Sequence, residues 1–272
     1  MRSRDNNVMS HEFDLSRMLV LPGRKLAGLR FVMKNVPEAL PALTGVASKH
    51  GALPLYFASS PSLLTEEFPV LVFLDMTKAD TGIGDLAKDL EATGMIRRAE
   101  VIEPIAEGLI IDNLSHPITV GGSRAIVLRA AAYRRLIDEV KAQFGSGAVA
   151  FLYYMGIETG RGFGRLHRTA AEAVGLKDPI EIFRRVSTAM SQWAGLGRIE
   201  VVHIGDSGGK VAVYDSFECE GAKVTGQPYA ALAKGMIAGA FAELFGKAFE
   251  VVETECIAKG DPRCVFEIRA KQ

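Results

Sequence analysis

The sequence has few cysteines, no long apolar run and no excess of charge of either sign. Its 272 residues include three cysteines, and 32 basic side chains balance 32 acidic ones. Three is too few and too odd a number for a disulfide framework, so we expect a reducing, cytoplasmic setting. A net charge of zero argues against direct nucleic-acid binding or a membrane-surface role. No apolar stretch reaches the roughly 20 residues that span a bilayer, and residues 1–7 lack the apolar core of a targeting segment.

What remains is the composition of a globular protein. Apolar residues make up 48% and charged residues 24% of the chain, which is enough material for one large or two small domains with proper cores. We find no internal repeat, no low-complexity tract, no ATPase motif and no helix-turn-helix segment. Any regulation of transcription would therefore act through a partner.

The first half alternates strand-like and helix-like segments. After a loose arm over residues 1–22, the hydrophobic pattern predicts the order strand, helix, strand, strand, helix, strand, over residues 25–34, 37–50, 53–59, 68–77, 84–93 and 95–102. This order is typical of the ferredoxin-like split βαβ arrangement. We expect this domain to cover residues 23–104, followed by a connector over residues 105–123.

The second half, residues 124–272, has a different order. Helices are expected first, at residues 124–144, 147–167 and 179–193. Strands at 198–204 and 210–219 flank the hairpin turn Asp206–Gly209, a helix follows at 228–245, and two strands at 248–256 and 263–269 end the chain. This order predicts an α+β domain in which helices pack on an antiparallel sheet.

The last predicted hairpin contains a candidate metal site. Glu253, Cys256 and Cys264 form the pattern E-x2-C-x7-C across a strand, a turn and a strand. A carboxylate and two thiolates that converge from a hairpin can hold zinc if a fourth ligand completes the tetrahedron. The alternative is that Cys256 and Cys264 are simply free thiols.

The same segment resembles the V4R (4-vinyl reductase-like, hydrocarbon-binding) domain. That family ends with a helix rich in Gly and Ala, here residues 235–239, then an acidic strand with Glu253. Cys256, the run Ala-Lys-Gly-Asp-Pro at 258–262 and Cys264 follow. Upstream, residues 151–164 look like the family's early helix and residues 215–218 like its central strand. The resemblance implies a domain that encloses a small apolar or aromatic molecule.

The resemblance also implies a ligand set for zinc. In phenol-responsive sensors of this family, a Glu and three Cys bind the metal, and Glu253, Cys256 and Cys264 match three of the four. The remaining Cys of the family falls at Ala230 in this chain. Cys219 is the only other thiol, so Cys219, water or a partner chain would complete the site.

The first domain resembles the ACT family of regulatory modules, on a shorter motif. Residues 35–40 read Asn-Val-Pro-Glu-Ala-Leu, where that family has Asp/Asn-x-Pro-Gly-x-Leu. Glu38 replaces the glycine that lets an amino acid approach the backbone. The resemblance implies the fold and a role in pairing, and it leaves amino-acid binding open. Because modules of both families commonly pair, we expect a homodimer.

Candidate pocket residues are few, and no catalytic residue is predicted. The glycines between residues 156 and 164 lie inside a helical pattern, so they indicate close helix packing or room for a ligand rather than a phosphate loop. The five histidines show neither ligand spacing nor a nucleophile motif. We expect an apolar cavity of a few hundred Å³ between the early helices and the sheet. Its candidate lining residues are Phe151, Tyr154, Trp193, His203, Phe241 and Phe245.

The sequence therefore predicts a small-molecule-binding protein with a sensory or regulatory role. One alternative is an enzyme or enzyme accessory in the reduction of a tetrapyrrole vinyl group, which would need a cofactor that no nucleotide motif reveals. A second alternative is an interaction scaffold related to transport-particle subunits.

Overall fold

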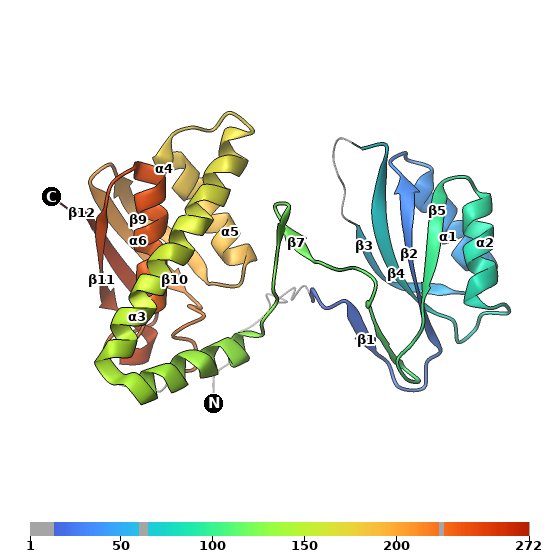
Figure 1. Ribbon diagram of the computed structural model, residues 1–272, viewed down its shortest axis with the longest axis horizontal. Helices are drawn as coiled ribbons and strands as arrows, with labels where there is room; N and C mark the ends of the chain where they lie inside the picture. The colour runs from blue at the N-terminus through green and yellow to red at the C-terminus, as the bar shows by residue number, and fades with distance from the viewer. Residues whose placement is uncertain (1–13, 60–64, 223–225, 272) are drawn as a thin grey trace. The chain divides into compact units, whose positions relative to one another are not determined.

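The computed structural model describes residues 14–59, 65–222 and 226–271, and the chain divides into two compact units, Met1–Ile118 and Thr119–Gln272 (Figure 1). Each unit has its own hydrophobic core. Residues 1–13 of the expected N-terminal arm lie outside the described residues.

Unit 1 contains a four-stranded antiparallel sheet of order β3-β4-β2-β5. The strands and helices follow one another in the order that the hydrophobic pattern predicts. They are β2 (Leu26–Lys34), α1 (Ala39–Lys49), β3 (Leu53–Ser59), β4 (Glu67–Asp75), α2 (Ile83–Ala92) and β5 (Ile96–Ile102). The fully buried Leu43 of α1 and Leu90 of α2 pack on one face of the sheet, against Phe31 of β2.

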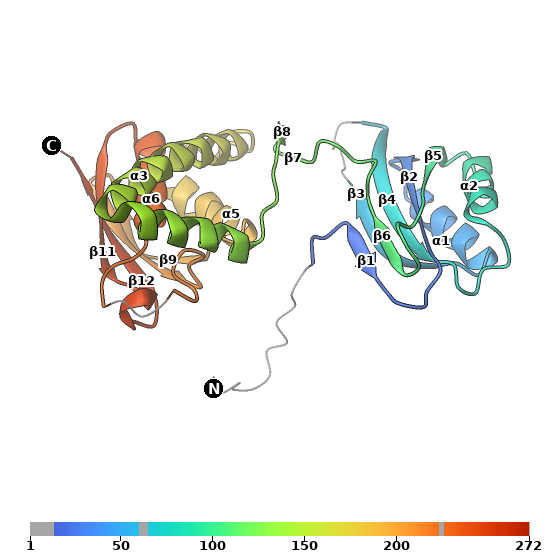
Figure 2. The same ribbon diagram turned by 60° about the horizontal axis from the view of Figure 1, so that its bottom comes forward.

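The other face of this sheet is covered by a short two-stranded ribbon. β1 (Met18–Val20) pairs antiparallel with β6 (Leu109–Ile111). Ile110 of this ribbon is buried with Phe73 and Leu71 of the sheet, on the side away from the helices (Figure 2). Part of the segment expected to be a loose arm is thus a paired strand, because its apolar residues close this second core.

Unit 2 places helices on one face of a second antiparallel sheet, of order β11-β12-β10-β9. The buried Ile237 and Phe241 of the last helix share one core with Val211 and Phe266 of the sheet. The elements are β7 (Thr119–Val120), β8 (Ser123–Arg124), α3 (Ala130–Glu172), α4 (Pro179–Glu181), the π-helical turn η1 (Ile182–Ser187), α5 (Thr188–Trp193), β9 (Arg198–Gly205), β10 (Gly208–Tyr214), α6 (Ala231–Phe245), β11 (Phe249–Glu255), the 3₁₀ turn η2 (Ile257–Lys259) and β12 (Cys264–Ala270).

Three expectations for this unit need correction. The helices expected at 124–144 and 147–167 are two limbs of α3, which begins at Ala130 and breaks at Gly145, where φ is 52°. The strand expected at 210–219 ends at Tyr214, because Asp215 turns the chain with φ at 51°. Residues 216–219, including Cys219, therefore lie in a turn rather than on a strand. The helix expected from residue 228 begins at Ala231.

Glycines allow α3 and α6 to pack with their backbones in contact. A Cβ atom on Gly160 would lie 2.0 Å from the carbonyl oxygen of Met236, and one on Gly239 would lie 2.0 Å from that of Ile157. Side chains larger than hydrogen do not fit at these positions. This confirms the helix-packing interpretation for Gly156, Gly160 and Gly164, and these three set which face of α3 points into the unit. For Gly162 the packing interpretation is wrong, because a Cβ atom there would meet nothing within 4 Å. Within the described residues, no helix has both the length and the apolar character of a membrane span.

Candidate functional site

Unit 2 contains an apolar cavity of about 100 Å³. Its walls come from the second limb of α3, from η1 and α5, from β9 and β10, and from α6. The residues that line it are Val120, Phe163, Leu166, His167, Phe183, Ser187, Met190, Ser191, Trp193, Ala194, Leu196, Ile199, Val213, Ser216, Phe217, Ala233, Met236, Ile237 and Ala240. The space is smaller than the expected few hundred Å³ and suits a molecule of about one six-membered ring, since apolar cavities of about 150 Å³ take benzene.

Besides the indole N–H of the exposed Trp193, four polar side chains interrupt this apolar lining. Nδ1 of His167 lies 2.9 Å from Oγ of Ser187, and both residues are buried. Oγ of Ser191 donates to the carbonyl oxygen of Gly197 at 3.4 Å. Ser216 is the fourth, and it is 1% exposed. Among the described residues, no Asp, Glu, Lys or Arg lines the cavity.

Burial in the cavity wall keeps the imidazole ring of His167 neutral. Burial lowers the pKa of His167 from 6.5 to about 4, because the imidazolium loses its hydration there and no carboxylate compensates. At neutral pH the ring therefore carries no charge and presents one donor and one acceptor nitrogen. The lining is neutral as a whole, so it suits an uncharged molecule.

The six residues that the sequence proposed for a pocket do not lie together in the structure. Trp193 lines the cavity. Phe151 and Tyr154 are 59% and 67% exposed and lie on the face of α3 away from α6. His203 is exposed on β9. Phe241 is fully buried in the core between α6 and the sheet, and Phe245 stacks on it.

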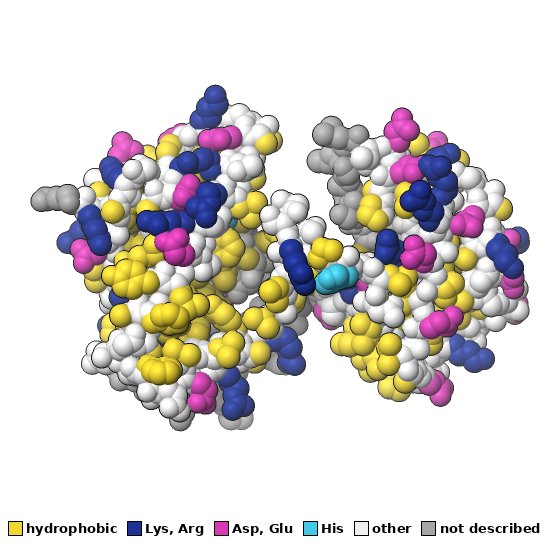
Figure 3. Space-filling view, viewed as in Figure 1, with side chains coloured by type: hydrophobic (Ala, Val, Ile, Leu, Met, Phe, Trp, Pro, Cys, Tyr) yellow, Lys and Arg dark blue, Asp and Glu magenta, His cyan; other side chains and the backbone are white. Residues whose placement is uncertain are grey.

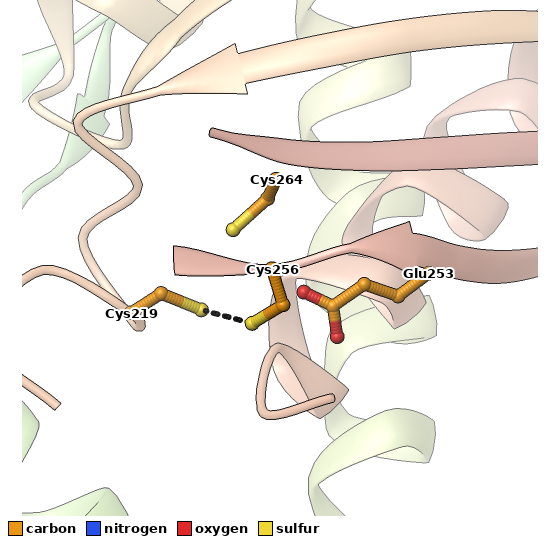
Figure 4. A group of neighbouring side chains, drawn as sticks. All are labelled: Cys219, Glu253, Cys256 and Cys264. Atoms are coloured by element: carbon orange, nitrogen blue, oxygen red, sulfur yellow. Dashed lines mark hydrogen bonds between the residues drawn. The ribbon is translucent and has the colours of Figure 1, made fainter. Parts of the chain in front are cut away.

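A second group of side chains lies near the turn of the last hairpin, between β11 and β12. Glu253 on β11, Cys256 after β11, Cys264 at the start of β12 and Cys219 from the turn after β10 bring one ligand atom each to within 4.8 Å of the others. Figure 4 shows the four side chains converging, with Cys219 and Cys256 in contact. Their sulfur atoms are 3.7 Å apart. Two sulfurs that share a tetrahedral zinc ion lie about 3.8 Å apart, given bonds of about 2.3 Å.

The turn between the two strands is built by the motif that the sequence shows. Gly260 has φ at 100°, a conformation that side chains with a Cβ atom avoid. The carboxylate of Asp261 accepts a hydrogen bond of 2.7 Å from the backbone N–H of Cys256. The backbone N–H groups of Lys259 and Asp261 donate in turn to the carbonyl oxygen of Cys256. These bonds hold Cys256 in place beside Cys264.

The charge state of this cluster is set by burial and by hydrogen bonds among its members. Hydrogen bonds from the thiols of Cys219 and Cys264 lower the pKa of Cys256, because they stabilise its thiolate. The bond to Cys256 raises the pKa of Cys219. Burial raises the pKa of Glu253 to about 8. One thiolate is thus favoured without metal, and a cation would displace the remaining protons.

Ala230, just before α6, lies beside the carboxylate of the cluster. The backbone N–H of Ala230 donates to Oε2 of Glu253 at 3.1 Å. The other oxygen, Oε1, is buried and has no hydrogen-bond partner among the described residues. An oriented carboxylate with one free buried oxygen, beside three thiols, is a donor set that fits zinc.

A buried ion pair ties the first limb of α3 to the start of α6. Glu218 is fully buried, and it accepts hydrogen bonds from Nζ of Lys141 at 3.0 Å and from the backbone N–H groups of Leu232 and Ala233. Lys141 also donates to the carbonyl oxygen of Tyr229. No sequence pattern pointed to this pair, because it forms between a helix and a turn 77 residues apart.

Comparison with known proteins gives a match to part of the chain. The Methanocaldococcus jannaschii protein MJ1642 is 32% identical over 87 residues, which are 32% of this chain and 52% of that protein. The chain thus matches about half the length of this relative.

Three solved structures match part of the chain. The phenol-responsive sensory domain of the transcription activator PoxR, solved with phenol, has 22% identity and a TM-score of 0.49, over 56% of this chain and 79% of that domain. A Naegleria fowleri trafficking protein particle complex subunit 3, covalently bound to palmitic acid, has 16% identity and a TM-score of 0.41. The match covers 53% of this chain and 93% of that subunit. A vinyl-4-reductase family protein from M. jannaschii has 19% identity and a TM-score of 0.34. The match covers 55% of this chain and 100% of that protein. The family-level match is more local: residues 210–270, which include most of β10 and all of α6, β11 and β12, match the V4R domain.

Proposed function

We propose that unit 2 binds a small, uncharged, apolar or aromatic molecule and that this binding serves a sensory or regulatory role. The cavity is the observation that carries the proposal. It is lined almost entirely by apolar side chains, it has room for about one ring, and its few polar groups are neutral. This combination is typical of ligand sites rather than of ordinary packing voids.

Ligand binding can be tested by filling the cavity. Ala233 lines the cavity from α6, whereas Ala150 is exposed on α3. Ala233→Leu should abolish the rise in melting temperature that small ring compounds cause in the wild-type protein, and Ala150→Leu should preserve it. Native mass spectrometry of the wild-type protein, followed by extraction of bound molecules, identifies the natural ligand. If no compound raises the wild-type melting temperature, the proposal is wrong.

We further propose that zinc binds to Glu253, Cys256, Cys264 and Cys219. The close donor atoms and the unpaired buried oxygen of Glu253 support this set. Bound zinc supplies a cross-link between the last hairpin and the turn after β10. Cys219 replaces the thiol that Ala230 cannot offer, so no ligand from a partner chain is needed. Because all three cysteines are free and buried, we place the protein in the reducing cytoplasm.

For unit 1 we propose a ferredoxin-like, ACT-like module that acts in pairing. The strand order β3-β4-β2-β5, with two helices on one face, supports this assignment. The site at which the ACT family takes amino acids contains Glu38, so we assign no ligand to it. A homodimer in which this module responds to the state of unit 2 is the form of regulation we propose, without direct contact to nucleic acid.

An apolar surface on unit 2 supports self-association. Side chains of this kind gather over α3 on the face shown in Figure 3. On α3, the exposed apolar side chains Phe144, Phe151, Tyr154 and Met155 are between 44% and 70% exposed. Phe151, Tyr154 and Met155 are three and four residues apart, so they share one face of the helix, and adjoining exposed apolar side chains are typical of interaction sites.

A further inference from the structure

Among the described residues that line the cavity, one buried polar group is left unsatisfied by the protein itself. Of the four polar side chains in its wall, His167, Ser187 and Ser191 have hydrogen-bond partners. In the part of the chain that the structure describes, Oγ of Ser216 is buried without any partner. Ser216 is 1% exposed and lines the cavity from the turn after β10.

An unpaired buried hydroxyl is costly to a folded protein. Leaving such a group without a hydrogen bond destabilises the fold by about 1–3 kcal/mol. An alanine at this position would avoid that cost, because its methyl group suits the apolar wall. A group in the ligand that pairs with the hydroxyl would remove the cost on binding.

The backbone holds Ser216 firmly in this position. Asp215 takes the left-handed conformation, with φ at 51°, which ends β10 and directs the chain into the turn. The carbonyl oxygen of Ser216 accepts hydrogen bonds from the N–H groups of Cys219 and Glu220, at 3.0 Å and 2.7 Å. The next residue, Phe217, is fixed by a bond from its N–H to the carbonyl oxygen of Leu196. The hydroxyl is thus presented on a rigid support, as a recognition group requires.

We infer that Ser216 is the group that recognises the polar end of the ligand, and that the ligand is a small, neutral molecule of about one ring that carries a single hydroxyl or carbonyl oxygen. This inference rests on the proposed function of unit 2. The ligand is uncharged because the wall offers no side chain of opposite charge, and burying an unpaired ion is far costlier than burying a neutral polar group. It carries an oxygen because a wholly apolar molecule would leave Ser216 unpaired.

Phenol and toluene form a suitable pair of probes, since they differ only by a hydroxyl in place of a methyl group. Titration calorimetry on the full-length protein would measure their affinities for the wild type, for Ser216→Ala and for Ser191→Ala. Ser191 also lines the cavity, but its hydroxyl already has a partner. We expect Ser216→Ala to weaken phenol binding about tenfold, the value of one hydrogen bond, and to leave toluene binding unchanged or tighter. Ser191→Ala should change the ratio of the two affinities little.

The outcomes separate the inference from the function on which it rests. If toluene and phenol bind but Ser216→Ala leaves the ratio of their affinities unchanged, Ser216 does not recognise the ligand and only this inference is overturned. If neither probe binds the wild type at millimolar concentration, the ligand-binding function and the inference both fall. Ser216→Cys keeps a side chain of similar size with a weaker donor, and it should lower phenol affinity in the same way if the alanine variant folds poorly.

Discussion

Acidification should destabilise unit 2 through His167. Because the pKa of this buried ring is about 4 in the folded protein and 6.5 is its ordinary value, the unfolded chain binds the proton more tightly. The contribution of the neutral ring to stability is complete above about pH 7 and is lost as the pH falls from 6.5 towards 4. From the two pKa values, the loss between pH 8 and pH 5 is about 2 kcal/mol.

Trp193 offers a direct assay for this effect. It is the only tryptophan of the chain and lies at the cavity, so its fluorescence reports the unfolding of unit 2. Urea unfolding at pH 8 and pH 5 would give the free energy of unfolding for the wild type and for His167→Gln. The wild type should lose about 2 kcal/mol more than the variant over this interval.

Comparing the two proteins removes the contribution of other groups. Burial raises the pKa values of Glu218 and Glu253, so these carboxyl groups favour the folded state at acid pH, in the opposite direction to His167. They are present in both proteins and cancel in the difference. His203→Gln, at an exposed site on β9, is the matched control and should keep the wild-type pH dependence. Equal losses in the wild type and in His167→Gln would refute the reasoning.

Three further changes test the metal cluster, the helix packing and the apolar face of α3. Protein purified without chelator should carry about one zinc per chain by elemental analysis, and Cys256→Ser should reduce this below about a tenth; equal zinc content in both would reject the site. Gly160→Ala should lower the free energy of unfolding by about 3 kcal/mol because its Cβ has no room, whereas Gly162→Ala, in open space on the same helix, should be neutral or stabilising in the same urea assay. Sedimentation at micromolar concentration should show a dimer that Phe151→Asp weakens and Val252→Asp, exposed on β11, does not; a wild-type monomer would contradict the pairing.

The sequence was most informative where a short motif controls local geometry. The pattern E-x2-C-x7-C lies in one hairpin. The irregular pairing of β11 after Glu253 and the tight turn at Gly260 bring Glu253, Cys256 and Cys264 together. The succession of strands and helices along unit 1 could also be predicted, because each element there shows a clear hydrophobic period. Cys219 could be named only as the remaining thiol, because its approach depends on how the turn after β10 folds.

The cavity was harder to locate because aromatic residues alone do not show which face of a helix is buried. On α3 that face is set by Gly156, Gly160 and Gly164, which contact α6. Phe151 and Tyr154 lie on the opposite side, while His167, three residues after Gly164, continues the buried face. The spacing of the glycines could have identified His167. Nothing in the sequence could have identified Ser187 or Ser216, which reach the cavity from a π-helical turn and from an irregular turn.

The turn after β10 links the features of unit 2. Ser216 and Phe217 line the cavity, and the ring of Phe217 lies 5.7 Å from that of Tyr133 on the first limb of α3. Glu218, the next residue, holds the same limb through Lys141, and Cys219 belongs to the thiol cluster. Four consecutive residues therefore contact the ligand cavity, the limb of α3 before the break at Gly145, and the candidate zinc ligands.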